Sequence, residues 1–125
     1  MPRWPRPPRI GGWRNTLAAI SEENVEVHDF DIPDAGVYHG HEGFLAWLKG
    51  WGEGWDSWHV EDLAFRAAGD DQVIAVFRMV AKGGHSGMEL ERNDAIVYRI
   101  DGGLIARIEY FNDQKLALEA VGLSA

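Results

Sequence analysis

Hydrophobic and polar residues follow two different periods along this chain of 125 residues. Residues 13–20 and the segment HEGFLAWLKGWGEGW, which begins at His41, carry apolar side chains three or four positions apart, and this spacing predicts helices. The second helix should end near Gly50, where the first of three closely spaced glycines weakens it. Residues 113–123 predict a closing helix.

Five other segments predict strands, namely residues 25–30, 57–68, 72–82, 88–100 and 104–112. The third of them, QVIAVFRMVAK, is apolar on both faces, which is typical of a central strand. Short turns rich in glycine and aspartate separate the last four strands. Helices followed by a meander of long antiparallel strands predict an α+β fold, with helices packed on one face of the sheet.

The opening MPRWPRPPRIGG predicts no regular structure, because its four prolines lack amide donors and restrict their neighbours. We expect residues 1–12 to form a flexible arm, with a Pro/Arg ligand for some partner as the alternative. Residues 13–125 contain no internal repeat and are expected to form one domain.

Composition and charge narrow the classes of function. The net charge is −8, and residues 15–125, with 8 basic and 20 acidic side chains, carry −12, which would repel nucleic-acid phosphates. The absence of cysteine excludes disulfides, thiolate metal sites and cysteine nucleophiles. No apolar run is long enough for a membrane span, and the N-terminus lacks the apolar core of a secretory signal. We therefore expect a cytoplasmic protein that binds neither nucleic acid nor membrane.

A carboxylate lies in the middle of an apolar strand face. Along residues 88–100, Asp94 shares one strand face with Leu90, Ile96 and Tyr98. An unpaired carboxylate there would be costly. Asp94 could therefore keep a proton near neutral pH, which suits a general acid or base, or form an ion pair with Arg92 or Arg78.

Arg78 raises the same question on the predicted central strand, because it shares a face with Ile74, Val76 and Val80. Its guanidinium could orient a substrate oxygen, hold an aspartate, or lie where the strand leaves the core.

Tryptophan is concentrated in one short region, at Trp47, Trp51, Trp55 and Trp58. An aromatic stripe at helical spacing is typical of a core. A cavity lined by Trp and Tyr is also suited to a flat apolar ligand or a sugar.

A metal site is a weaker interpretation of the segment VEVHDFDIPDAGVYHGHEG. His39 and His41, together with Asp29, Asp31 and Asp34, are residue types that bind zinc or iron. Their spacing matches neither HxxxH nor a facial triad, so we expect no metal. GGHSG, before Met88, is a turn between strands rather than a phosphate loop, and no nucleophile elbow is present.

Three motifs resemble the SnoaL-like polyketide cyclase group of the nuclear-transport-factor-2-like superfamily. A Y-x-G-x-E-G pattern before a helix is matched by residues 38–43, and the Ser-Gly pair before the long strand by residues 86–87. A closing signature of D-G-x-I, an aromatic residue, Asp and A-L-E-A-x-G-L is matched approximately by residues 101–123. The resemblance covers residues 13–125.

The resemblance implies a cone-shaped fold, in which a strongly curved antiparallel sheet wraps around helices and encloses a deep pocket, often in a homodimer. The superfamily contains ketosteroid isomerases, limonene-epoxide hydrolases, scytalone dehydratases, polyketide cyclases and non-catalytic binding modules. Its isomerases place their base at the end of the first strand, where Asp29 lies, and their second acid at the counterpart of Ile96, one step from Asp94. The long first helix of the family has no counterpart in MPRWPRPPRI, so the cone should be partly open or covered by another chain.

We therefore expect a cofactor-free enzyme acting on a small apolar or aromatic molecule, such as an isomerase, a cyclase, a hydratase or an epoxide hydrolase. The candidate catalytic residues are Asp29 as base, Asp94 as second carboxylate, and Arg78 and Tyr38 for polar orientation. The candidate substrate-binding residues are Trp47, Trp51, Trp58, Phe77, Tyr98 and Tyr110, of which Tyr110 could also orient the substrate. A non-catalytic binding or dimerisation module is the alternative, and it predicts an ion-paired Asp94 and a cavity filled by its own indoles. Sugar binding by exposed tryptophans is a third interpretation.

Overall fold

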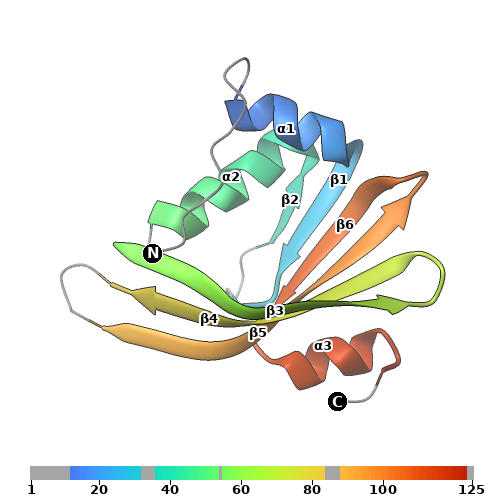
Figure 1. The fold of residues 1–125 in the computed structure, drawn as a ribbon. Helices are drawn as coiled ribbons and strands as arrows, with labels where there is room; N and C mark the ends of the chain where they lie inside the picture. The colour runs from blue at the N-terminus through green and yellow to red at the C-terminus, as the bar shows by residue number, and fades with distance from the viewer. Residues whose placement is uncertain (1–11, 32–35, 54, 84–87, 124–125) are drawn as a thin grey trace.

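The computed structural model describes residues 12–31, 36–53, 55–83 and 88–123 (Figure 1). The helices are α1 (Gly12–Ile20), α2 (Gly40–Glu53) and α3 (Gln114–Ala120). The strands are β1 (Ser21–Asp29), β2 (Val37–His39), β3 (Ser57–Ala68), β4 (Gln72–Lys82), β5 (Glu89–Asp101) and β6 (Leu104–Phe111). Residues 1–11, which make up most of the predicted arm, lie outside the described residues.

The six strands form one curved sheet in the order β2-β1-β6-β5-β4-β3 (Figure 1). β3, β4, β5 and β6 form the expected antiparallel meander. β1 pairs with β2 in antiparallel and with β6 in parallel orientation, so the sheet is mixed at this point. The prediction of an α+β fold with a curved sheet is confirmed, and β2 is a short strand that the sequence pattern did not predict.

The helices occupy both faces of the sheet. α1 and α2 lie over the concave face, whereas α3 lies under the opposite face (Figure 1). α3 buries Ala117 and Leu118 in a second core with Ile74, Ala95 and Val97. The prediction that the helices share one face is therefore wrong for α3. Because β4 is apolar on both faces, each of its faces needs a cover.

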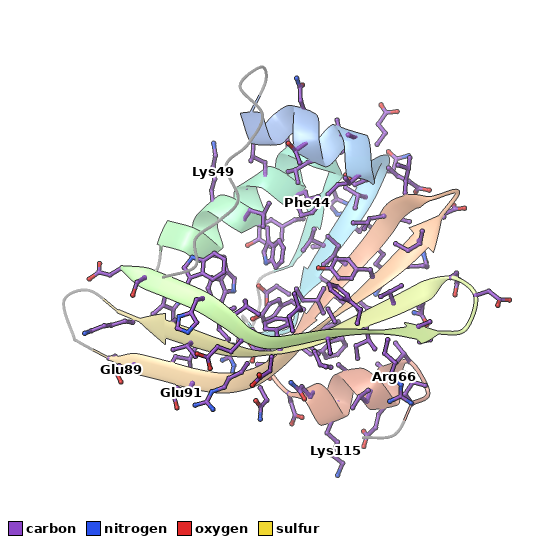
Figure 2. The ribbon with its side chains drawn as sticks, viewed as in Figure 1. Phe44, Lys49, Arg66, Glu89, Glu91 and Lys115 are labelled. Carbon is purple, nitrogen blue, oxygen red and sulfur yellow. The ribbon has the colours of Figure 1, made fainter. Side chains whose placement is uncertain are left out.

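The main core lies between α2 and the concave face of the sheet. Phe44 points from α2 toward the sheet, whereas Lys49 and Glu89 point away from this space (Figure 2). The fully or nearly buried members of this core are Leu17, Val25, Val27, Phe44, Leu45, Trp47, Phe77, Met79, Ile108 and Tyr110. Glu42 lies in the first turn of α2, where its negative charge suits the helix dipole.

β3 is an edge strand with a bulge. The register of its pairing with β4 shifts between Glu61 and Ala64, and Asp62 there has a positive φ of 54°. Such a bulge changes which alternate residues face the concave side, so that odd-numbered residues face it after Asp62. Within the part of the chain that the structure describes, no helix is long and apolar enough to span a membrane.

Candidate functional site

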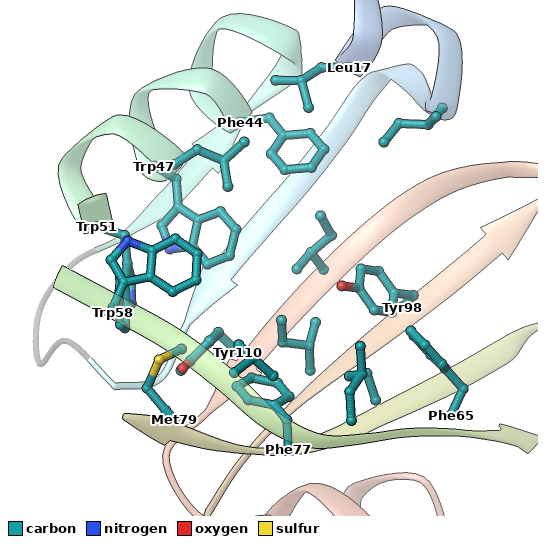
Figure 3. Close-up of a pocket in the computed structure, with 17 residues that line it drawn as sticks. Leu17, Phe44, Trp47, Trp51, Trp58, Phe65, Phe77, Met79, Tyr98 and Tyr110 are labelled. Atoms are coloured by element: carbon teal, nitrogen blue, oxygen red, sulfur yellow. The ribbon is translucent and has the colours of Figure 1, made fainter. Parts of the chain in front are cut away.

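A cavity of about 340 Å³ lies between α1, α2 and the concave face of the sheet (Figure 3). Its walls are almost entirely apolar. The lining residues are Leu17, Ile20, Phe44, Trp47, Leu48, Trp51, Trp58, Val60, Leu63, Phe65, Ala75, Phe77, Met79, Ile96, Tyr98, Ile108 and Tyr110.

Strand alternation explains how the sheet builds its part of the wall, because every second side chain points to the same face. β4 contributes Ala75, Phe77 and Met79, and β5 contributes Ile96 and Tyr98. The even-numbered face of β5 is therefore the inner face, as the sequence pattern predicted. Met79 was not among the predicted residues, although a position two residues from Phe77 on the same strand faces the same side.

The mouth of the cavity is formed by three apolar side chains that remain largely exposed. Ile20 ends α1, whereas Leu63 and Phe65 follow the bulge of β3. Each of the three side chains lines the cavity and is at least 44% exposed. Sequence analysis did not identify Leu63 and Phe65, because only the bulge at Asp62 brings odd-numbered residues of β3 to the concave face.

The six predicted substrate-binding residues all line the cavity. The Tyr110 ring lies 6.1 Å from Trp47, 6.2 Å from Trp51 and 6.2 Å from Phe77, measured between ring centroids. Trp51 and Trp58 meet edge to face at 5.7 Å. The aromatic side chains thus form a continuous wall around an open space, and the cavity is not filled by its own indoles.

Asp94 is fully buried and ion-paired next to the cavity. The Arg92 guanidinium contacts both carboxylate oxygens, with Nε 2.5 Å from Oδ1 and Nη2 2.9 Å from Oδ2. The Tyr110 hydroxyl donates a hydrogen bond to Oδ2. Arg92 is therefore the partner of Asp94, as the ion-pair interpretation proposed, and Tyr110 separates this carboxylate from the cavity.

Arg92 also holds a second aspartate. Its Nη1 lies 3.0 Å from Asp31 Oδ1, and Asn112 Nδ2 donates to the same Oδ1 at 3.1 Å. Hydrogen bonding to Asp94, and less strongly to Asp31, raises the pKa of Arg92 above its ordinary value. The guanidinium therefore bridges Asp31 and Asp94.

Asp29 is the last residue of β1 and is only 5% exposed. The Trp47 indole Nε1 donates to its Oδ2 at 2.7 Å, and the backbone N–H of Asp31 donates to its Oδ1 at 2.9 Å. Asp29 does not line the cavity, since Trp47 lies between them. Each predicted carboxylate is thus separated from the cavity by one residue of its wall, Asp29 by Trp47 and Asp94 by Tyr110.

The other two predicted catalytic residues lie away from the cavity. Arg78 is on the opposite face of β4 from Phe77, and its Nη2 is 2.5 Å from Glu91 Oε2. Tyr38 is on β2, where it is half-buried and packs against the main core. The structure therefore brings Asp29 and Asp94 close to the cavity wall but leaves Arg78 and Tyr38 outside it.

Two tyrosine hydroxyls in the cavity wall hold their protons firmly. Burial raises the pKa of Tyr98. Burial raises the pKa of Tyr110 as well, and its hydrogen bond to Asp94 adds to this effect. Both hydroxyls are hydrogen-bond donors at neutral pH.

No three His, Asp or Glu side chains gather into a possible metal site within residues 12–31, 36–53, 55–83 and 88–123. His41 Nε2 lies 3.1 Å from the Ser21 carbonyl oxygen, and Asp29 and Asp31 have the partners already described. Asp34 lies outside the described residues.

The chain is similar to one protein family and to several solved structures. A family profile described as a SnoaL-like domain matches residues 12–108. An NTF2-like protein from Burkholderia xenovorans is 21% identical with a TM-score of 0.68, over 86% of this chain and 82% of that chain. A protein of ketosteroid isomerase-like fold from Catenulispora acidiphila, in complex with trimethylamine, is 18% identical with a TM-score of 0.68, over 90% of this chain and 85% of that one. TerC, co-crystallized with polyporic acid, is 15% identical with a TM-score of 0.64, over 86% and 85%. No functionally curated protein matches the sequence.

Proposed function

This chain belongs to the SnoaL-like domain family, and we propose that it binds a small, largely apolar or aromatic molecule in the cavity beneath α2. The observation that carries the proposal is the unfilled aromatic cavity of about 340 Å³. Ligand pockets are typically about 300–1,000 Å³, apolar and partly aromatic. Protein interiors are otherwise close-packed, and an empty cavity destabilises a fold, so a ligand explains why the space is present.

Two solved structures of this fold support the same interpretation. One was solved in complex with trimethylamine and the other with polyporic acid. Proteins of this fold therefore accommodate small molecules, and we extend this property to the present chain.

Equilibrium dialysis with 2-ethylnaphthalene, a flat apolar probe, tests the proposal. Ala75 is buried in the cavity wall, so Ala75→Phe should fill part of the space and weaken binding at least tenfold. The matched control is Ala64→Phe, because Ala64 is exposed on β3 and does not line the cavity. Absence of binding to the wild-type chain, or equal weakening in both variants, would contradict the proposal.

Cofactor-free proton transfer is the second candidate function, and the position of Asp29 favours it. Asp29 lies at the end of β1, nearly buried, one hydrogen bond behind the cavity-lining Trp47. In this candidate the Trp47 indole turns away from Asp29, and the freed carboxylate accepts a proton from a carbon next to a carbonyl of the ligand. Isomerisation and aldol cyclisation both begin with such a step, whereas in a hydration the same carboxylate would take its proton from water. Arg78 and Tyr38 receive no role, because they lie outside the cavity.

Deuterium exchange into the acetyl group of 2-acetylnaphthalene, followed by NMR in D₂O, measures this step. The wild-type chain should accelerate exchange, whereas Asp29→Asn should abolish the acceleration and still bind the probe. Exchange at the same rate in both proteins would refute the role of Asp29 and leave the binding proposal intact.

The proposal also includes the homodimer implied by the family resemblance and the cytoplasmic location expected from the sequence. Sedimentation equilibrium tests the first, and a single species with the mass of one chain would contradict it. Fractionation of cells that express the protein tests the second.

A further inference from the structure

We propose that Tyr98 selects ligands carrying one uncharged hydrogen-bond acceptor, such as a ketone oxygen, on an otherwise apolar skeleton. The inference rests on the proposed binding function and adds the chemical class of the ligand. It follows from how the few polar groups of the cavity wall are oriented.

Two of these polar groups already use their protons. The indole N–H of Trp47 donates to Asp29, and the hydroxyl of Tyr110 donates to Asp94. Since Trp has one N–H and Tyr has one O–H, neither group has a proton left for a ligand. Tyr110 can still accept a hydrogen bond, whereas Trp47 cannot.

Tyr98 differs from both. Within the described part of the chain its hydroxyl has no hydrogen-bond partner, although the side chain is largely buried in the wall. Figure 3 shows the oxygen pointing into the cavity and away from Phe65. Within the described residues the oxygen is not fully enclosed, so a ligand that enters the cavity can reach it and accept its hydrogen bond.

The surroundings of Tyr98 restrict the acceptor to a neutral oxygen. The side chain projects from β5 on the same face as Ile96, and its cross-strand neighbour on β6 is Ile108. A carboxylate or phenolate would have to leave water for this apolar wall, which is costly for a charged group. A carbonyl oxygen carries a smaller desolvation cost, and the skeleton behind it can lie against Phe77 and Trp47.

Trp51 is the competing donor and must be distinguished from Tyr98. Its indole also lines the cavity, at the end where it meets Trp58. An acceptor preference caused by the indole N–H would be lost in Trp51→Phe and retained in Tyr98→Phe. The two conservative substitutions therefore separate the two donors.

The experiment compares two probes that differ by one carbonyl oxygen, 2-acetylnaphthalene and 2-ethylnaphthalene. Equilibrium dialysis gives the ratio of their affinities for the wild-type chain, Tyr98→Phe, Tyr110→Phe and Trp51→Phe. Tyr98→Phe should lower the ratio by about threefold to tenfold, the value of one neutral hydrogen bond, by weakening the ketone alone. Tyr110→Phe and Trp51→Phe should leave the ratio unchanged.

Three results would overturn the role of Tyr98: an unchanged ratio in Tyr98→Phe, an equal fall in either control variant, or equal weakening of both probes. The last would mean that Tyr98 contributes packing and not a hydrogen bond. Failure of both probes to bind the wild-type chain would instead overturn the proposed function, and the inference with it.

Discussion

Replacing Arg92 by methionine should destabilise the fold, because Arg92 is the cation that compensates a fully buried carboxylate. Asp94 is 0% exposed, and both of its oxygens contact the guanidinium. In Arg92→Met the side chain keeps much of its volume but loses its charge. Of its donors among the described residues, Asp94 would then retain only the hydroxyl of Tyr110.

The magnitude follows from the burial of the two partners. Removing one partner of a buried ion pair costs about 3–5 kcal/mol. Arg92 is 26% exposed, so water can partly replace it, and we expect about 3 kcal/mol, the lower end of that range. For a domain of this length the loss corresponds to a fall in Tm of about 10 °C.

Urea unfolding followed by tryptophan fluorescence measures the effect, with a second substitution as the decisive comparison. Adding Asp94→Asn to Arg92→Met removes the uncompensated charge and should restore more than half of the lost stability. Arg78→Met is the matched control, because Arg78 is exposed and its ion pair with Glu91 should be worth less than about 1 kcal/mol. A loss below about 1 kcal/mol in Arg92→Met, or a double variant less stable than the single one, would refute the reasoning.

Three further predictions concern stability and pH. Trp47→Phe leaves the nearly buried Asp29 without its indole donor and should cost about 1–3 kcal/mol in urea unfolding. Burial raises the pKa of Tyr98 above 10.0. The contribution of its protonated hydroxyl to folding stability is therefore fully present below about pH 10 and is lost as the pH rises further. The urea midpoint should therefore fall less between pH 9 and about 11 in Tyr98→Phe than in the wild-type chain. A hydrogen bond from His28 lowers the pKa of Glu26 below 4.5, so its contribution is present above that pH and is lost on acidification. Glu26→Gln should accordingly reduce the decline in Tm from pH 5 to about pH 3, and an unchanged decline would contradict this assignment.

Strand periodicity was sufficient to predict most of the sheet. The predicted bounds of residues 57–68 and 72–82 agree with β3 and β4, and the resemblance to the SnoaL-like group is confirmed. β2 could not be predicted, because a strand of three residues has no period of its own. Its pairing depends on β1, which lies elsewhere in the sequence.

The orientation of β4 was the point at which the pattern became ambiguous. Both faces of this strand are apolar, so alternation could not tell whether Arg78 lies on the cavity face or on the opposite face. Ile74 packs against α3 on one face, whereas Phe77 lines the cavity on the other. Only the position of α3, which tertiary packing decides, places Arg78 on the outer side.

The ion pair of Arg92 with Asp31 illustrates a second limit. The two residues are 61 positions apart, and no local sequence pattern predicts that they pair. The pairing of Arg92 with Asp94 was accessible, because residues two apart on a strand share a face.

The exposed mouth of the cavity has a consequence for how this protein can change over evolutionary time. Ile20, Leu63 and Phe65 touch the space where a ligand would bind, yet water covers much of each side chain. Substitutions at largely exposed positions usually alter stability by less than about 0.5 kcal/mol. Mutations can therefore vary the width and chemistry of the opening while the buried Asp94–Arg92 pair and the core stay intact. Natural variation, or a directed-evolution library restricted to these three codons, can therefore change ligand specificity with little loss of folding stability.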